Sequence, residues 1–399
     1  MGEWKEYKLG ELGIVVTGKT PSSKFPDEFG NDMPFVTPSD YSNYNKWALN
    51  AERYLSNKGI EKLRSKVLPT GSLLVTCIGS DMGKVVMNKI PVITNQQINS
   101  IIPFDKFDSN FIYYKLIDEY DTLRMYGEAG TAVPIVNKTD FESIEVEIPN
   151  DKNEQQSIAS ILSSLDDKID LLHRQNKTLE ALAETLFRQW FVEEADESWE
   201  TEQLGNIFDI GIGRTPPRKE QHWFSTNPND VKWISIKDMD FNGVYIYSVT
   251  EYLTHNAVEQ FNVPIIPNDC VILSFKMTIG RLAITTEKML SNEAIAHFIP
   301  KTESKLFSVF LYLFLKTYKF ELLGSTSSIV ESINSQMIKE IVIMIPDEKK
   351  LKLFREVIKP YFTKIKTNQA QISTLTQLRD TLLPKLMSGE IRLNCDSCD

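Results

Sequence analysis

One segment of the sequence has the residue types and spacing of a nucleotide-binding loop. Residues 13–20 read Gly-Ile-Val-Val-Thr-Gly-Lys-Thr and fit the pattern G-x-x-x-x-G-K-S/T at every position. In such a loop the backbone amides surround the phosphates, Lys19 reaches the β- and γ-phosphates, and Thr20 binds magnesium. Taken alone, the pattern predicts an NTPase whose nucleotide binding depends on Lys19.

The neighbouring residues argue against a nucleotide site. A P-loop leads into a helix whose N-terminus faces the phosphates, but residues 21–23 read Pro-Ser-Ser and are typical of a turn. The Ile-Val-Val at 14–16 favours a strand. The segment also recurs 195 positions later, where a Phe and an Arg replace Gly13 and Lys19 while Gly-x-Thr-Pro stays. What is repeated is a turn with a basic residue, and not a phosphate cradle.

No other catalytic or metal-ligating constellation occurs in the sequence. The four histidines lack metal-ligand spacing, and no Gly-rich cofactor turn is paired with the Asn/Asp-Pro-Pro-aromatic tetrad of an adenine methyltransferase. Cys77 and Cys270 lie in apolar runs and are expected in the core. Cys395 and Cys398 form a lone C-x-x-C, which is weak support for zinc. We expect a chain that catalyses nothing itself and has no cofactor or metal of its own.

Length and composition indicate a multidomain globular protein. The 399 residues are enough for two to three domains, and 42% apolar with 25% charged residues is ordinary for a soluble chain. The net charge of -10 argues against a protein that simply coats a polyphosphate, although local basic surface could still bind nucleic acid. The N-terminus has no apolar signal core, and the most apolar run, 306–315, is shorter than the roughly 20 residues that span a bilayer. We therefore expect a cytoplasmic location and no membrane contact.

The chain contains an internal duplication. Its second half repeats the anchor residues of the first at an offset that drifts only from 195 to 198 positions. The clearest matches pair Trp4, Leu9, Gly10, Gly18, Thr20 and Pro21 with Trp199, Leu204, Gly205, Gly213, Thr215 and Pro216. A molecule that carries one unit twice is suited to contacting two related sites.

Each half ends in a long segment with heptad spacing. Apolar residues at a and d positions over four to five repeats predict a coiled-coil seam, in which a single Asn per helix would fix register and partner choice. Pro360 could kink the second helix near its start, and Pro384 is expected to end its regular part. The predicted seam consists of Leu165, Ile169, Leu172, Asn176 and Leu179 in the first helix and Tyr361, Ile365, Asn368, Ile372 and Leu375 in the second.

These patterns together predict an α+β protein. Short β-rich runs separated by turns, with one aromatic-rich helix per half, indicate two α/β domains. The two helices would lie antiparallel, because a domain separates them along the chain, and the domains would be related by a pseudo-twofold axis. The expected boundaries are 1–150 and 196–347 for the domains, 151–195 and 348–393 for the spacer helices, and 394–399 for a tail. The helices could instead form an oligomerisation stalk.

Several longer motifs occur in a fixed order, most of them twice. They are the Trp-x-x-x-x-Leu-Gly opening with Gly-x-Thr-Pro, Leu68–Val75, Thr94–Gln97, Asn153–Ile169, Leu186–Phe191 and Leu383–Ile391. In this arrangement the chain resembles, over essentially its whole length, the specificity subunit of type I restriction-modification systems.

The resemblance implies a role in reading DNA. Each domain would be a target recognition domain for one half of a bipartite, asymmetric site in double-stranded DNA. The helices would set the gap between the halves and bind two adenine-methylating modification subunits, which restriction subunits would join. S-adenosylmethionine, ATP and magnesium would belong to those partners. The competing interpretation is a coiled-coil scaffold with two protein-binding domains and no DNA binding.

Candidate DNA contacts are polar and basic residues in three loops of each domain: the Gly-x-Thr-Pro loop, a mid-domain turn, and the loop after the aromatic helix. Phosphates are bound by Lys, Arg, Ser and Thr, and base edges by similar side chains in exposed loops. Any single residue could equally be solvated surface. The candidates are Lys19, Thr20, Ser22, Ser23, Lys24, Ser80, Lys84 and Thr131 in the first half, and Arg214, Thr215, Arg218, Lys219, His222, Lys276, Thr278, Arg281, Thr326, Ser327 and Ser328 in the second.

Overall fold

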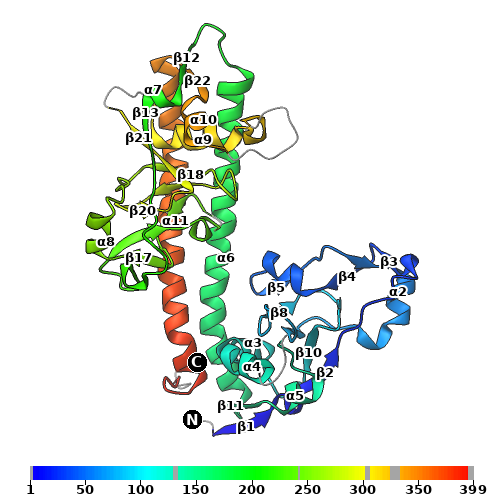
Figure 1. Ribbon diagram of the computed structural model, residues 1–399. Coiled ribbons are helices and arrows are strands. Elements are labelled where there is room, and N and C mark those ends of the chain that lie inside the picture. The colour runs from blue at the N-terminus through cyan, green and yellow to red at the C-terminus, as the bar shows by residue number, and fades with distance from the viewer. Residues whose placement is uncertain (1–2, 129–133, 241–242, 302–305, 324–332, 394–399) are drawn as a thin grey trace, which may run out of the picture. The chain divides into compact units, whose positions relative to one another are not determined.

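The structure is a computed structural model that describes residues 3–128, 134–240, 243–301, 306–323 and 333–393 (Figure 1). It divides into two compact units. The first unit comprises the chain up to Asp170 together with the segment from Leu375 onward, and the second unit comprises Leu171–Thr374. Each unit therefore joins one globular domain to segments of both long helices, and each is described below by itself.

The first domain is built on a five-stranded sheet in the order β2-β10-β7-β8-β5. All pairs are antiparallel except β5 with β8. The central strand β7 reads Leu-Leu-Val-Thr and is buried at every position, as expected for a strand covered on both faces. The strands are β2 (Gly13–Thr17), β10 (Ile98–Pro103), β7 (Leu73–Thr76), β8 (Val85–Asn88) and β5 (Trp47–Ala48).

Two smaller sheets and an aromatic-rich helix complete this domain. Helix α3 (Ser109–Asp118) is capped by Asp108, whose carboxylate accepts from the Phe111 amide at 2.9 Å. One face of α3 packs into the core cluster that contains β7 and β10. The smaller sheets are β3-β6-β4-β9, from β3 (Phe29–Gly30), β6 (Tyr54–Leu55), β4 (Met33–Val36) and β9 (Ile93–Thr94), and β1-β11, from β1 (Trp4–Lys8) and β11 (Glu145–Pro149).

The second domain repeats this architecture strand for strand. Its five-stranded sheet has the order β13-β21-β18-β19-β16, its four-stranded sheet the order β14-β17-β15-β20, and β12 pairs with β22. The elements are β13 (Phe208–Ile212), β21 (Ile295–Pro300), β18 (Val271–Ser274), β19 (Leu282–Thr285), β16 (Tyr245–Ile246), β14 (Phe224–Ser225), β17 (Glu251–Leu253), β15 (Val231–Ile234), β20 (Leu290–Ser291), β12 (Glu200–Gln203), β22 (Val342–Ile345) and helix α9 (Ser308–Thr317). The sequence duplication is thus a duplication of fold.

Two long helices follow the domains, α6 (Lys152–Arg188) and α11 (Glu348–Met387). In the second unit Asn176 pairs with Asn368 and Phe187 packs on Phe354, so the two segments run antiparallel. In the first unit Asp166 meets Arg379. The predicted α+β class, with two repeated α/β domains and two long helices, is confirmed.

The prediction that Pro384 ends the regular helix is wrong. Helix α11 continues through Pro360 and Pro384 to Met387. A proline removes one helical hydrogen bond, but it cannot outweigh the packing of the residues beyond it. Leu386 and Met387 are fully buried in the core of the first unit, and the Lys115 ammonium donates to the Met387 carbonyl at 3.4 Å. Tertiary packing therefore holds the last turn.

Each domain is fixed to its helix segments by buried polar contacts. In the first unit the Tyr114 hydroxyl donates to Asp166 at 2.6 Å and the Lys46 ammonium to the Ser163 hydroxyl at 3.0 Å. Burial of this lysine, only partly offset by Asp166 and Asp167, lowers its pKa to about 8. In the second unit Gln369 bonds the backbone of Tyr245 as both donor and acceptor, each at 3.0 Å. These contacts orient the domains on the helices that follow them.

The predicted seam residues are all buried or half-buried on their helices. In the second unit the Asn368 amide donates to the Asn176 side-chain oxygen at 2.9 Å, and both residues are buried. A buried Asn pair costs stability but fixes helix register, because any slip leaves both amides without their partners. Phe362 on α11 is also buried, although it lies outside the predicted seam.

In the part of the chain that the structure describes, no helix is both long and apolar enough to cross a bilayer. Cys77 and Cys270 are buried in the cores as predicted, and burial raises the pKa of each thiol to about 12. Cys395 and Cys398 lie outside the described residues.

Candidate nucleic-acid interface

In the first unit two of the candidate loops converge with the 94–97 loop at one end of the five-stranded sheet. Strands β2 and β7 both run antiparallel to β10, and their last residues, Thr17 and Thr76, lie opposite Asn99 and Ile98 at the start of β10. The Gly-x-Thr-Pro loop after β2, the turn between β7 and β8, and the 94–97 loop before β10 must therefore share this end of the sheet (Figure 1). A hydrogen bond from the Lys19 amide to the Thr94 carbonyl (2.9 Å) connects the Gly-x-Thr-Pro loop to the 94–97 loop.

The second unit repeats this convergence. The ends of β13 and β18, Ile212 and Ser274, lie opposite Ala296 and Ile295 at the start of β21. The Arg214 amide donates to the Ser291 carbonyl at 2.8 Å, which matches the contact made by Lys19. Three loops far apart in the sequence thus form one surface in each unit, here called the loop cluster.

The repeated glycine of Gly-x-Thr-Pro is required by a close backbone approach. A Cβ on Gly18 would lie 2.2 Å from the Asn95 carbonyl oxygen, and a Cβ on Gly213 would lie 2.1 Å from the Ser291 carbonyl oxygen. No side chain fits either position without moving the loop. The glycine therefore allows the basic turn to lie directly against the 94–97 loop, or against its counterpart at 291–294. This close contact explains why the glycine recurs better than phosphate binding does.

The P-loop pattern does not form a nucleotide site. Gly13–Thr17 is strand β2, paired with β10 over its whole length, and residues 18–22 continue without a helix. Among the described residues, no group of three His, Cys, Asp or Glu is placed to hold a metal ion.

Several candidates present exposed side chains that have no polar partner for their charged groups among the described residues. These cations are available to phosphates at the loop cluster and its flanks. They are Lys19 and Lys24 in the first unit and Lys219 and Lys276 in the second, and the hydroxyls of Ser23 and Thr278 and the ring of His222 are also exposed.

Other candidates are engaged within their own unit. Arg218 makes a two-pronged ion pair with Glu251, both bonds 2.8 Å, and lies over the rings of Phe224 and Trp233. Such an arginine is held rigidly, and its charge is paired with that of the carboxylate. The remaining pairs are Lys84 with Asp81, Arg281 with Asp240 and the Ile236 carbonyl, Arg214 with the Phe261 carbonyl, Thr20 with Gln96, and Thr215 with Glu293, while the Ser22 hydroxyl accepts from the Lys24 amide and the Ser80 carbonyl from Arg124.

Four candidates lie outside the described residues: Thr131, Thr326, Ser327 and Ser328. In the first unit the chain just beyond Thr131 returns to the loop cluster, because the Gly79 amide donates to the Pro134 carbonyl at 3.1 Å and Ile78 pairs with Ile135. No such contact is described in the second unit.

Sequence reasoning missed two features of the loop clusters. Gln96 and Glu293 occupy matching positions on the third loop and both are exposed. The signal for both residues is the repeated Asn that precedes them, Asn95 and Asn292. Met277 is 94% exposed at the tip of the β18–β19 turn, with φ of 62° in the left-handed region. Nothing in the residue pattern around it distinguishes this methionine from a core residue.

Comparison with known proteins bears directly on this duplicated arrangement. The profile of the type I restriction modification DNA specificity domain matches the chain twice, at residues 1–181 and 196–377. The chain belongs to this family of specificity proteins. Each match takes in one globular domain and most of the helix behind it.

Relatives of similar length support the assignment. The specificity subunit of the type I restriction enzyme MjaIX from Methanocaldococcus jannaschii is 28% identical over 98% of this chain and 94% of its own length. That of HindI from Haemophilus influenzae is 24% identical over 98% of this chain and all of its own length. The crystal structure of the S subunit of a type I system from M. genitalium has the same fold, with a TM-score of 0.60 at 16% identity over 96% of both chains.

Proposed function

We propose that the chain reads a bipartite, asymmetric sequence in double-stranded DNA, with one domain on each half-site. The observation that carries this proposal is the same loop cluster, built twice at the same end of the same sheet. A duplicated frame supports two contacts of one kind, while different loop residues support different half-sites. The domain boundaries we assign are 1–150 and 196–347.

Differences between the loop clusters support asymmetry of the target. Corresponding positions carry Lys19 and Arg214, or Gln96 and Glu293. Lysine and arginine both pair with guanine edges, whereas glutamine pairs with adenine and glutamate accepts from the cytosine amino group. Two domains with these substitutions should not prefer the same bases. We also propose that the candidate residues of these loops contact the DNA.

The long helices suit a spacer. At about 1.5 Å per residue, the 37 residues of α6 extend roughly 55 Å, which exceeds one turn of duplex, about 34 Å. The helix termini would then set the gap between half-sites.

We further propose that the helices bind two modification subunits, which carry the adenine methyltransferase site and its S-adenosylmethionine. Leu182 on α6 and Leu378 on α11 occupy corresponding positions, 196 residues apart, and are exposed by 48% and 45%. Because the helices are related by the duplication, they offer two equivalent binding points, and these leucines mark matching positions on them. Restriction subunits, with ATP and magnesium, would join this complex, and the chain itself would catalyse nothing.

The test is to map adenine methylation by long-read sequencing in host cells with and without this gene. We expect one split, asymmetric motif to lose methylation when the gene is deleted. Reintroducing the gene should restore the same motif. An unchanged methylation map, in cells where a modification subunit is bound to this chain, would favour a protein scaffold without DNA binding.

A further inference from the structure

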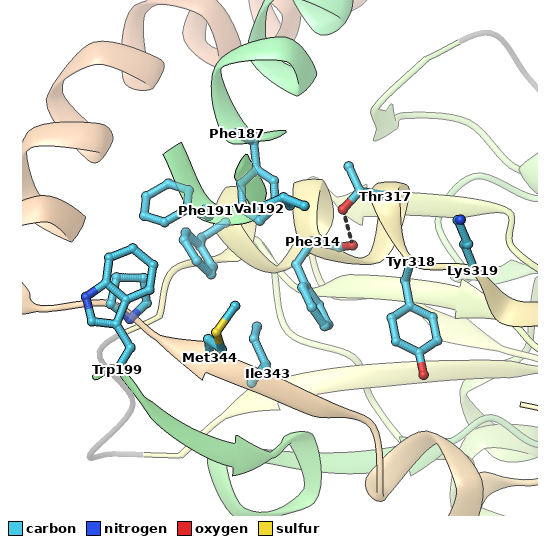
Figure 2. Close-up of a pocket in the computed structure, with 12 residues that line it drawn as sticks. Phe187, Phe191, Val192, Trp199, Phe314, Thr317, Tyr318, Lys319, Ile343 and Met344 are labelled. Atoms are coloured by element: carbon cyan, nitrogen blue, oxygen red, sulfur yellow. Dashed lines mark hydrogen bonds between the residues drawn. The ribbon is translucent and has the colours of Figure 1, made fainter. Parts of the chain in front are cut away.

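The second unit contains an apolar cavity of about 370 Å³ whose lining includes no residue of its loop cluster. Figure 2 shows aromatic rings from the end of α6, from α9 and from the segment before β12 facing it, with β22 along one side. Its main lining residues are Phe191, Trp199, Phe310, Phe314, Tyr318 and Met344. The volume is in the range of sites that hold a small molecule or a few side chains of a partner.

The segment beside this cavity is strongly acidic. Between Val192, which lines the cavity, and Gln203, the chain carries six carboxylates and no Lys or Arg. These carboxylates are Glu193, Glu194, Asp196, Glu197, Glu200 and Glu202. Lys319 lines the far part of the cavity, and Lys350 lies over the Trp199 ring, 5.0 Å from its centre. The remaining negative charge disfavours DNA and favours a cationic partner.

The corresponding place in the first unit is covered by the chain itself. Trp4 and Phe111 correspond to Trp199 and Phe310. A Cβ on Gly389 would lie 3.2 Å from the Trp4 ring, so the segment after α11 passes directly over that tryptophan. Ile391 and Leu393 from this segment pack on the core cluster that contains Phe111.

Chain continuity prevents the same solution in the second unit. After α6 the chain turns through residues 189–193 and enters β12 at Glu200, so it has no free tail to lay over Trp199. The lining differs as well. Helices α3 and α9 are both ten residues long, so Phe314 stands where the first unit has Lys115, which pairs with Glu119 at 3.0 Å. The place beside Trp4 in the first unit is therefore covered and polar, whereas the cavity beside Trp199 in the second unit is open and apolar.

We propose that the cavity of the second unit binds a short segment of a partner protein that carries two aliphatic side chains around a cationic one. This is the chemistry of residues 391–393, Ile-Arg-Leu, which cover the matching surface of the first unit. The aliphatic groups would enter between Phe191, Phe314 and Met344, and the cation would face the acidic segment. This surface is independent of DNA reading and can be tested without DNA.

The probe is a synthetic peptide with the sequence of residues 388–393, added to the full chain labelled with ¹³C at its methionine methyl groups. We expect the Met344 methyl signal to shift, with a dissociation constant on the order of 1 mM, as befits two buried aliphatic side chains. Val192→Glu and Met344→Glu should each weaken binding about tenfold, with the Val192→Glu titration followed on the Met344 signal and the Met344→Glu titration by competition. The matched control is Val342→Glu, an exposed residue of the same strand, which should leave binding unchanged.

The charge requirement is tested with a second peptide in which Glu replaces Arg. It should bind several-fold more weakly, and the difference should shrink at high salt. Equal binding of both peptides, no shift at Met344, or unchanged binding to the Val192→Glu variant overturns the proposal. A dimer of the purified chain that Val192→Glu dissociates would assign the cavity to a second copy instead. A small apolar molecule retained in native mass spectrometry would assign it to that ligand.

Discussion

The turn between β7 and β8 in the first unit and the turn between β18 and β19 in the second have the same frame but different tips. Gly83 and Gly280, with φ of 94° and 91°, donate to Thr76 and Ser274 at 2.8 and 3.0 Å. The side-chain hydroxyls of this threonine and serine in turn donate to the Asp81 and Thr278 carbonyls. Duplication has therefore kept the hydrogen bonds that position the turn.

The tips carried on this frame differ in polarity. In the first unit Met82 is 1% exposed, against Gly127, and Asp81 pairs with Lys84 at 2.7 Å. In the second unit Met277 points outward, and the ammonium group of Lys276 has no polar partner among the described residues. A constant frame with a variable tip is a physical basis for two different DNA half-sites on one fold.

The largest expected effect comes from exchanging the tips. Replacing residues 276–279 by residues 78–82 keeps both ends of the turn, lengthens it by one residue and changes the side chains that it presents. We expect recognition of the second half-site to be lost, so that methylation at the original motif falls at least 100-fold, a plausible loss for several contacts at about 1–3 kcal/mol each. Binding of the complex to DNA with either half scrambled gives the control: only the second half should cease to matter.

The two methionines offer a separate test of the comparison. Met82→Ala removes a fully buried side chain and should lower the free energy of unfolding by about 2–5 kcal/mol. Met277→Ala should change it by less than about 0.5 kcal/mol, because the side chain is exposed, yet should weaken binding to the target DNA. Chemical denaturation and DNA binding on the same two variants measure both effects. Equal loss of stability in the two would contradict the assigned difference between the tips.

The two sheets also differ in their response to acid. His297 on β21 is buried over Gly211, and burial lowers its pKa to about 4, whereas the corresponding residue of the first unit is Ser100. The unfolded chain, with an ordinary pKa near 6.5, then binds the extra proton between pH 6.5 and 4. Stability of the second unit should fall by about 3 kcal/mol across that window.

The comparison variant for this prediction is His297→Gln, which cannot titrate in the window. Urea denaturation at pH 7, 5.5 and 4 should show the wild-type chain losing more stability than the variant as pH falls. Parallel losses in both chains would exclude His297 as the source.

The architecture could be predicted from the sequence because its signals repeat. The duplicated anchors, the turn-bounded strands and the heptads each appear twice. The function of one further repeated residue became clear only in three dimensions. Asp40 and Asp238, which lie 198 positions apart, each accept from a backbone amide three residues earlier and from another twelve residues later. From the sequence alone, a carboxylate with this role cannot be distinguished from any other acidic residue.

The details of the loop clusters could not be predicted for two physical reasons. Pairing of Arg218 with Glu251 depends on which segments meet, and that is set by sheet register rather than by local pattern. The exposure of Met277 depends on a left-handed backbone at one residue. Pro384 shows the same limit in a helix, since tertiary packing outweighs a local breaking signal.

The smallest expected effect compares Lys276 with Lys84. A lysine that neutralises a phosphate releases a counterion, so Lys276→Ala should reduce the slope of log affinity against log salt by about 1. Lys84 already neutralises Asp81, and moving it to a phosphate would leave that carboxylate unpaired beside DNA. Lys84→Ala should therefore reduce the slope by clearly less than Lys276→Ala. Asp81→Asn should raise affinity for DNA. In the Asp81→Asn background, Lys84→Ala should reduce the salt slope by as much as Lys276→Ala does in the wild-type chain. Salt titrations of the assembled complex on its own target distinguish these outcomes, and identical slopes for both lysine variants would show that the ion pair does not persist on DNA.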